Sequence, residues 1–373
     1  MALVGSINAP NDFGFKNRII NGAMVIDQRN AGASVTPTTT NTYTLDRWSA
    51  YLSQSSKYSV QQKNGVDSGA SNYEAGSTPA GFRNSLKVTS LSAYSVGASE
   101  FFSMLQTTEG LNVSDLGWGA AGASTVTLSF WVKSSLTGSF GGAVQSWSGD
   151  ANYPFSYTIS SANTWQQVSI TIPGPTFGTF ATNNTQSFAV GFCLGAGATV
   201  SGTAGTWSST IYRSATGATS VVGTNGATFY ITGVQLEKGS TATSFDYRPY
   251  GTELRLCQRY YEKSYDISTA AGTASVQGYS SSSVGSNTVP AGQAYSQICF
   301  AVSKRAAPTV TLYGFQGGSG KVSNWQSGAD FAANSGIANS TGTEGFNAYN
   351  NSGGTLATSA YAIIYHWTAS IEL

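Results

Sequence analysis

Short runs of alternating apolar and polar residues recur from Tyr43 to about Asp246, separated by clusters rich in glycine, serine and asparagine. Successive side chains of a β-strand point to opposite faces, so this alternation indicates strands that are buried on one side. The run STVTLSFWVKSS shows the pattern clearly, because one face carries Val126, Leu128, Phe130 and Val132. Many short strands between turn clusters predict a sandwich of two β-sheets.

Helix is predicted to be a minor element, because no stretch keeps apolar residues at i, i+3, i+4 and i+7 over three turns. The formal net charge is +1 and the charged residues are scattered. This argues against a nucleic-acid-binding protein, which normally carries a basic stripe. No run approaches the roughly 20 apolar residues of a membrane span. The first residues lack the basic and apolar regions of a signal peptide, so we expect no export signal.

The segment FYITGVQLEKGSTATSFDYRPY, residues 229–250, predicts a long strand with a bulge at Gly233. The overlapping segment YRPYGTELRLCQRYYEK, residues 247–263, is the most charged part of the chain. Leu254, Cys257 and Tyr261 fall three and four residues apart there, which fits a short helix, although a strand fits nearly as well.

Several of these motifs resemble known families. The order SFWVKSS, NTWQQVSITIPG, FYITGVQLEKG is similar to sugar-binding jelly-rolls of the carbohydrate-binding-module type. The segment NRIINGAMVIDQRNAG resembles the opening of phage tail and appendage proteins. The segment GTELRLCQRYYEKSY resembles one that joins such a domain to a C-terminal domain in tailed-phage virion proteins. These resemblances imply a tailed-bacteriophage virion protein of the tail-fibre or appendage type.

The expected fold is all-β: a jelly-roll β-sandwich preceded by an N-terminal arm and followed by a second, smaller all-β domain. Residues 1–40 are predicted to be a virion-anchoring arm with one short strand pair around Asn21-Gly22. Residues 41–246 are the carbohydrate-binding-like jelly-roll, and residues 247–263 are a linker with room for a short helix. Residues 264–373 are a C-terminal β-sandwich that acts as a tip or oligomerisation domain. Its last strand is apolar on both faces at its start, which indicates a sandwich core or a subunit interface.

Catalytic chemistry has little support in the sequence. His366 is the only histidine, lies within the last strand and is interpreted as structural. No nucleophile-elbow, metalloprotease, phosphate-loop or dinucleotide-binding motif is present, so we expect no enzyme. Cys193, Cys257 and Cys299 have no pairing pattern and are predicted to be buried thiols.

Sugar recognition uses flat aromatic faces with a few polar partners, because a pyranose presents C–H groups to a ring and hydroxyls to its edge. Trp118, Trp147, Trp207 and Trp325 lie in glycine- and serine-rich loops, where an exposed ring needs a reason such as a ligand or a neighbouring subunit. From these loops we predict that the ligand-facing residues are Trp147, Tyr153, Trp207 and Tyr212.

No cofactor is predicted. The resemblance implies that calcium can stabilise such jelly-rolls, and Glu237 in the closing strand supplies one carboxylate. The acidic residue that usually follows the opening motif is missing, since Met24 and Val25 stand there. Calcium takes six to eight oxygen ligands, so a site near Glu237 is not predicted.

The resemblance implies a virion structural protein that recognises host surface glycans without covalent chemistry. Its expected partners are other virion proteins through the arm, a host cell-surface polysaccharide, and further copies of itself as a homotrimer. The expected location is the virion surface. Two alternatives stay open: a capsid decoration or head-fibre protein that stabilises the shell, and a glycan-binding adhesin or glycan hydrolase fragment.

Overall fold

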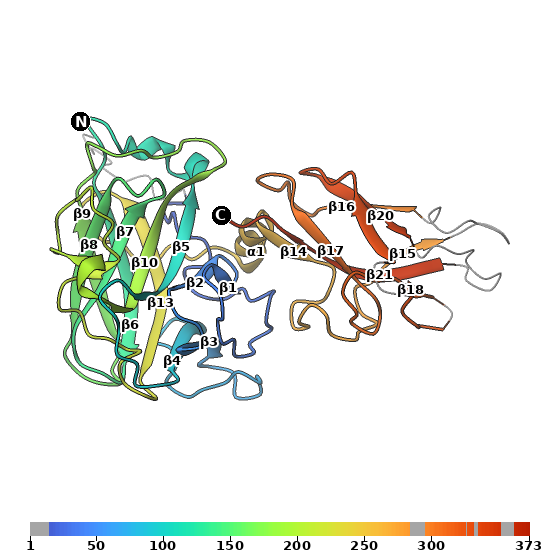
Figure 1. The fold of residues 1–373 in the computed structure, drawn as a ribbon, viewed down its shortest axis with the longest axis horizontal. Helices are drawn as coiled ribbons and strands as arrows, with labels where there is room; N and C mark the ends of the chain where they lie inside the picture. Colours follow the sequence, from blue (N-terminus) through green and yellow to red (C-terminus); the bar gives the residue numbers. More distant parts are fainter. Residues whose placement is uncertain (1–14, 284–294, 326, 332–334, 352–361) are drawn as a thin grey trace, which may run out of the picture.

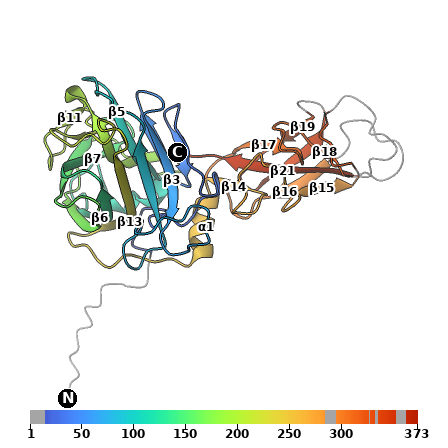
Figure 2. The same ribbon diagram turned by 90° about the horizontal axis from the view of Figure 1, so that it is seen from below.

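The computed structural model describes residues 15–283, 295–325, 327–331, 335–351 and 362–373. Two β-rich units lie side by side along the long axis of the molecule, and α1 (Tyr250–Gln258) lies where they meet (Figures 1 and 2). The prediction of an all-β protein is therefore confirmed. Among the described residues, no helix combines the length and the apolar character that a membrane span requires.

The first unit is a sandwich of two antiparallel sheets, with strand orders β1-β2-β5-β10-β7-β8 and β3-β4-β13-β6-β9. The strands of the first sheet are β1 (Thr42–Leu45), β2 (Trp48–Leu52), β5 (Phe101–Glu109), β7 (Gly138–Ser146), β8 (Asn152–Ile159) and β10 (Gln186–Ala196). Those of the second are β3 (Tyr58–Asn64), β4 (Asn84–Ser90), β6 (Val126–Ser134), β9 (Gln166–Ile172) and β13 (Thr228–Lys238). The chain passes repeatedly from one sheet to the other, which gives the predicted jelly-roll its double-layered form.

The core of this unit lies between the two sheets, as the alternation in the sequence predicted. The four apolar residues of β6 are fully buried: Val126, Leu128, Phe130 and Val132. Phe130 meets Phe192 of the opposite sheet edge to face, with ring centroids 5.0 Å apart. Edge-to-face aromatic pairs add to the free energy gained by burying the rings, so this contact stabilises the sandwich.

The predicted bulge at Gly233 is confirmed. The register between β13 and β6 shifts between Thr232 and Gln235, and Gly233 has a φ of 61°. A Cβ at this position would lie 2.6 Å from the Phe82 ring. Glycine is therefore required both by the left-handed backbone and by the close approach of the ring.

Residues 15–40 correct the prediction of a separate arm. Ile19 and Met24 are fully buried in the core of the sandwich, and Asn17 donates to the Val234 carbonyl at 3.0 Å. The predicted strand pair around Asn21-Gly22 is wrong, because Asn21 adopts a φ of 58° and its carboxamide bonds both backbone groups of Ile26. These contacts hold a turn rather than two paired strands. The first 14 residues of the predicted arm lie outside the described part of the chain.

The second unit is built around its last strand, β21 (Ala362–Ser370). β21 pairs with β14 (Tyr261–Lys263), β15 (Ser280–Ser283), β17 (Thr309–Tyr313) and β18 (Ser323–Asn324), and a separate sheet has the order β16 (Tyr295–Cys299), β20 (Gly345–Asn350), β19 (Gly336–Asn339). Ile363, Tyr365 and Trp367 of β21 contribute to the hydrophobic cluster of this unit. The sequence left a sandwich core and a subunit interface open for this strand, and the structure places it in a sandwich core.

His366 has the structural surroundings that were predicted for it. The side chain is fully buried, its ring stacks on Tyr265 with centroids 3.9 Å apart, and Nδ1 lies 3.1 Å from Ser264 Oγ. Burial lowers the pKa of the imidazole, because a charged ring would be poorly solvated there.

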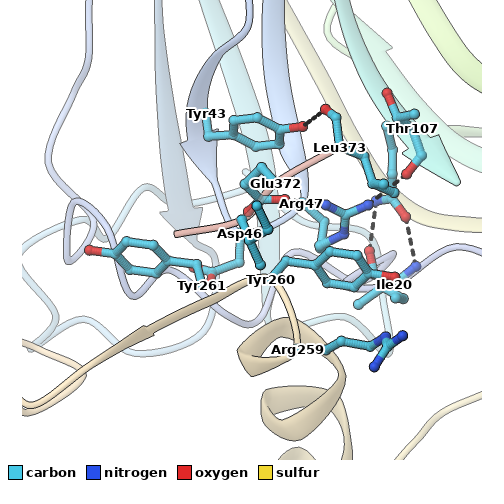
Figure 3. A network of polar contacts seen from close by, with 12 residues as sticks. Ile20, Tyr43, Asp46, Arg47, Thr107, Arg259, Tyr260, Tyr261, Glu372 and Leu373 are labelled. Carbon is cyan, nitrogen blue, oxygen red and sulfur yellow. Dashed lines mark hydrogen bonds and ion pairs between the residues drawn. The ribbon is translucent and has the colours of Figure 1, made fainter. Parts of the chain in front are cut away.

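The junction between the two units is buried and polar. Segment 247–263 forms α1 and then β14, so the helical alternative is the one observed. Figure 3 shows Glu372 and Leu373 reaching the first unit, where Glu372 pairs with Arg47 and the Tyr43 hydroxyl donates to the Leu373 carbonyl at 2.7 Å. On the other side, Arg259 pairs with Glu109 at 2.6 Å. Residues 247–263 are therefore packed between the two units and do not form a loose linker.

The cysteine prediction holds for two of three residues. Cys193 and Cys257 are buried, but Cys299 is exposed. The alternation of β16 explains the difference, because Ile298 and the following Phe300 pack against the hydrophobic cluster of the second unit and Cys299 then faces the other way.

Candidate functional site

A pocket lies on the outer face of the sheet that contains β5, β10 and β7. On this face Ala189 of β10, which lines the pocket, pairs with Gln145, and beside it Gly191 pairs with Leu105 on one side and Ala143 on the other. Their sequence neighbours point into the core, so these residues face outward. Two of them are alanine and one is glycine, which leaves a depression between the larger side chains.

A loop closes one side of this depression. It contains η3 (Ala198–Val200) and two short parallel strands, β11 (Ser201–Gly202) and β12 (Ser214–Ala215). The Gln145 carboxamide donates to the Tyr212 carbonyl at 2.9 Å, which fixes the loop to β7. The resulting pocket has a volume of about 160 Å³. Drug-sized ligands occupy roughly 300–1,000 Å³, so this pocket fits a single ring with its substituents rather than a longer ligand. Its principal lining residues are Tyr51, Leu105, Gln145, Trp147, Asn152, Ala189, Ile211 and Arg213.

Trp147 forms the open wall of the pocket, with 43% of its surface exposed. It lies in the turn between β7 and β8, which is held by the Asp150 carboxylate. This carboxylate accepts from Ser146 Oγ at 2.8 Å and from the Thr179 N–H at 3.0 Å. These donors hold the pKa of Asp150 well below its usual range, although partial burial opposes them. These bonds, with the one from the Trp147 N–H to the Ser187 carbonyl, fix the backbone from which the indole projects.

Asn152 supplies a buried acceptor to the same pocket. It is fully buried, and its Nδ2 donates to the Gly149 carbonyl at 2.9 Å. Its backbone N–H and carbonyl both pair with Ser208 at 2.8 Å, which fixes the residue. Among the described residues, the Oδ1 atom has no hydrogen-bond partner, and almost none of its surface is exposed. A buried polar atom without a partner costs about 1–3 kcal/mol, and a ligand hydroxyl would recover that cost only if the side chain turned to present Oδ1 to the pocket.

Arg213 and Tyr51 form the opposite wall. The guanidinium lies 4.7 Å from the centre of the Tyr51 ring, and Nη2 donates to the Tyr51 hydroxyl at 3.2 Å. Nη1 donates to Gln145 Oε1. Partial burial lowers the pKa of Arg213, but an arginine stays charged at any physiological pH. The pocket therefore combines a flat indole, a buried acceptor and a cation.

The four predicted ligand-facing residues have different outcomes. Trp147 lines the pocket, while Tyr212 contributes only its backbone carbonyl and lays its ring against Gly202. Tyr153 is 4% exposed and belongs to the hydrophobic core, so it does not line this pocket. The Trp207 ring packs against Tyr153 and its indole N–H donates to the Pro173 carbonyl at 2.6 Å. Trp207 therefore serves packing at the rim of the core and does not line this pocket.

Asn152 and Arg213 are functional candidates that the sequence analysis missed. Each is the direct neighbour of a predicted residue, Tyr153 and Tyr212. In β8 the apolar positions Tyr153, Phe155 and Tyr157 alternate toward the core, so Asn152 belongs to the opposite face. That alternation is a signal by which the sequence would have identified Asn152. Nothing comparable marks Arg213, which lies in an irregular loop.

The Glu237 carboxylate is bonded to neighbouring protein groups. Its carboxylate accepts from the N–H and the hydroxyl of Thr243 at 2.8 and 2.7 Å, and from Gln235 Nε2 at 2.9 Å. In the part of the chain that the structure describes, no three histidine, cysteine, aspartate or glutamate side chains are grouped so that they could hold a metal ion.

No model of a protein family matches this chain, and no curated protein matches it. Among solved structures, the enzymatically active domain of tailspike protein 4 of bacteriophage CBA120 is similar at 13% identity and a TM-score of 0.31, over 60% of this chain and 21% of that chain. The module TmCBM61, solved with β-1,4-galactotriose, matches at 12% identity and a TM-score of 0.29, over 60% of this chain and 100% of that chain. The family 11 carbohydrate-binding module of a Clostridium thermocellum cellulase matches at 13% identity and a TM-score of 0.25, over 56% of this chain and 98% of that chain. Likenesses this distant do not carry the fold assignment, which rests on the strand order given above.

Proposed function

We propose that this protein recognises a surface glycan by non-covalent binding in the pocket of Trp147, and that it does so on the surface of a tailed-phage virion. One observation carries the glycan-binding proposal: the half-exposed indole of Trp147 lines the same pocket as Asn152, whose buried Oδ1 has no partner among the described residues. An apolar platform next to a directed polar group is the combination that sugar rings require.

The chemistry of a pyranose matches both features. Its axial C–H groups pack against the face of Trp147, which gives apolar contact without a demand for polar partners. We propose that the Asn152 side chain turns toward the pocket on binding, so that its Oδ1, which has no partner among the described residues, accepts from a ring hydroxyl. The gain is the cost of the unpaired acceptor, less the cost of that movement.

A pocket of this size binds one residue of a polysaccharide, and such binding is weak. Linking several weak sites raises the overall affinity by about 10²–10⁴ without any new contact. We therefore propose that the chain acts as a homo-oligomer, a trimer by analogy with phage fibres, on a repeating host polysaccharide. The recognition step needs no bond to be made or broken in the glycan.

The virion part of the proposal is supported by the two segments that resemble phage proteins. They interlock in this structure: the Gln28 carboxamide donates to the Tyr261 carbonyl at 2.9 Å, and the Arg29 guanidinium lies 3.9 Å from the centre of the Tyr261 ring. Arg248 also donates to the Ile19 carbonyl at 3.2 Å. The two resemblances therefore concern one structural unit rather than two unrelated segments.

Substitution of Trp147 tests the binding site. Trp147→Ala should lower the affinity for a bound polysaccharide by about tenfold or more, as for exposed tryptophans at other interfaces. Its melting temperature should stay within 1–2 °C of the wild type, on the order expected for a surface substitution. Trp325→Ala is the matched control, since Trp325 is also a loop tryptophan and is 54% exposed in the second unit. Equal binding by the wild type and Trp147→Ala would refute the proposed site.

Quantitative mass spectrometry of purified virions tests the location. An appendage predicts a few dozen copies or fewer per particle, whereas hundreds of copies would indicate the capsid-decoration alternative. Absence of the protein from purified particles would refute the virion proposal and leave the glycan-binding proposal standing. Competition between the free protein and phage for host cells provides a second readout of adsorption.

A further inference from the structure

Arg213 is a cation of the pocket without an acidic partner. Among the described residues, its side chain donates only to Gln145 Oε1 and the Tyr51 hydroxyl, although a guanidinium has five N–H donors. Partial burial disfavours its charge, and among the described residues Tyr51 is the titratable neighbour that raises its pKa. Gln145 and Tyr51 orient the guanidinium but leave its charge uncompensated.

Other arginines have acidic partners. In the sandwich, Arg47 pairs with Glu372 and the well-exposed Arg83 pairs with Asp67 at 3.2 Å, and at the junction Arg259 pairs with Glu109. The carboxylate of the Trp147 turn, Asp150, accepts from Ser146, Ser148 and Thr179 and does not line the pocket. Within the described part of the chain, no acid therefore pairs with Arg213, whose positive charge lines the pocket.

We propose that Arg213 selects glycans that carry an acidic substituent, such as the carboxylate of a uronic acid, over neutral glycans at the same site. This inference rests on the proposed function and specifies the class of glycan. Guanidinium groups bind carboxylates through charge-assisted hydrogen bonds, which are shorter and stronger than those between neutral groups. The centre of the Phe101 ring lies 4.9 Å from the guanidinium, and the Tyr51 ring lies beside it. These rings exclude part of the water around the guanidinium, which strengthens its attraction to a carboxylate.

The arrangement of the pocket assigns a separate task to each wall. Trp147 supports the face of the sugar ring, Asn152 accepts from one hydroxyl, and Arg213 meets the acidic substituent on the opposite side. Gln145 lies between them and keeps Arg213 in place, so the cation is positioned before the ligand arrives. A positioned charge loses less side-chain entropy on binding than a free surface lysine or arginine would.

An array of bacterial capsular polysaccharides, each uronate-containing member printed beside its carboxyl-reduced form, tests the inference. Reduction converts the carboxylate to a hydroxymethyl group and leaves the linkages unchanged. The full-length chain should bind the acidic form about tenfold more tightly than the reduced form. Arg213→Gln should bind both forms equally, at the level of the wild type on the reduced form. Arg213→Lys should keep part of the preference, and Arg83→Gln should keep all of it.

The outcomes distinguish a failure of the inference about Arg213 from a failure of the proposed glycan-binding function. Equal wild-type affinity for acidic and reduced forms would overturn the role of Arg213, while the loss of binding in Trp147→Ala would still support the site. A uniform loss on both forms in Arg213→Gln, with a lowered melting temperature, would make Arg213 structural and would also overturn the inference. No binding to any polysaccharide, charged or neutral, would count against the proposed function itself. Binding to acidic forms should also weaken as salt is raised from 50 to 300 mM, as expected for a partly exposed charge pair.

Discussion

Arg47 and Glu372 form an ion pair between the two units of the chain, and only 1% and 7% of their side chains are exposed. Arg29 reaches the same carboxylate at 2.7 Å. The Arg47 guanidinium also lies 3.6 Å from the centre of the Tyr260 ring, which follows α1. One carboxylate of the second unit thus pairs with two arginines of the first across the junction.

Glu372→Gln should therefore destabilise the protein strongly. Removing one partner of a buried pair leaves uncompensated charge, which typically costs about 3–5 kcal/mol. Urea denaturation followed by tryptophan fluorescence measures the change. Asp67→Asn is the control, because the Asp67–Arg83 pair is about half exposed and is expected to contribute less than about 1 kcal/mol. Equal losses in the two variants would contradict the role given to Glu372.

Asp46 predicts a pH effect at the same junction. Burial raises the pKa of its carboxyl from 3.8 to about 6, against the opposing effect of Arg29. Between pH 3.8 and about 6, the Asp46 carboxyl is protonated in the folded state and ionised in the unfolded state. The contribution of Asp46 to stability therefore rises as the pH falls from 7 toward 5. Asp46→Asn cannot titrate. The stability of the wild type relative to Asp46→Asn should increase by about 1 kcal/mol between pH 7 and pH 5.

Melting curves of both proteins at several pH values measure this difference. Contributions from other titrating groups cancel in the comparison, and any hydrogen bond lost to Gln28 gives an offset that does not depend on pH. A difference that stays constant from pH 5 to pH 7, or that changes with the opposite sign, would show that Asp46 has an ordinary pKa.

Gly233→Ala should cost about 2–4 kcal/mol, because the left-handed backbone and the crowding against Phe82 act together. Gly226→Ala separates the two effects. Gly226 also has a left-handed φ of 74°, but no atom lies within 4 Å of an added Cβ. We expect about 1–2 kcal/mol for Gly226→Ala in chemical denaturation. If Gly233→Ala lowers the free energy of unfolding no more than Gly226→Ala does, the Phe82 ring moves aside at little cost.

Cys299 should be the one thiol that reacts quickly with Ellman's reagent in the folded protein, since Cys193 and Cys257 are buried. Burial also raises the pKa of both buried thiols, which further reduces their reactivity. One equivalent is expected before unfolding and three in denaturant. Fast reaction of a second equivalent in the folded state, or of any in Cys299→Ser, would contradict the packing described here.

The sequence predicted those parts of the fold that depend on local periodicity. The strand faces of β6 and the bulge at Gly233 follow from residues that are close together in the chain, whereas the spacing in residues 247–263 left both a helix and a strand open for the segment that forms the helix Tyr250–Gln258. The packing of residues 15–40 did not follow, because Asn17 finds its partner at Val234, 217 positions away. Spacing within a short segment carries no information about such contacts.

The site was predictable to a smaller degree for the same reason. Trp147 stood out because a large aromatic residue in a glycine- and serine-rich turn needs a partner. Tyr153 was predicted to face a ligand, but the alternation of β8 turns its side chain into the core and places the preceding residue, Asn152, in the pocket lining. Arg213 meets Tyr51 across 162 positions, so only the folded chain brings the cation to the pocket.

The most direct test of the central claim is the indole N–H region of the NMR spectrum during titration with an oligosaccharide from a bound polysaccharide. Each of the eight tryptophans gives one signal there, and Trp147→Phe assigns the one that matters. We predict a large shift for Trp147, with Trp118 and Trp207 unchanged because their indole N–H groups remain bonded to the Ser124 and Pro173 carbonyls. Saturable shifts confined to other tryptophans, with Trp147 unmoved, would contradict the account and place the glycan elsewhere.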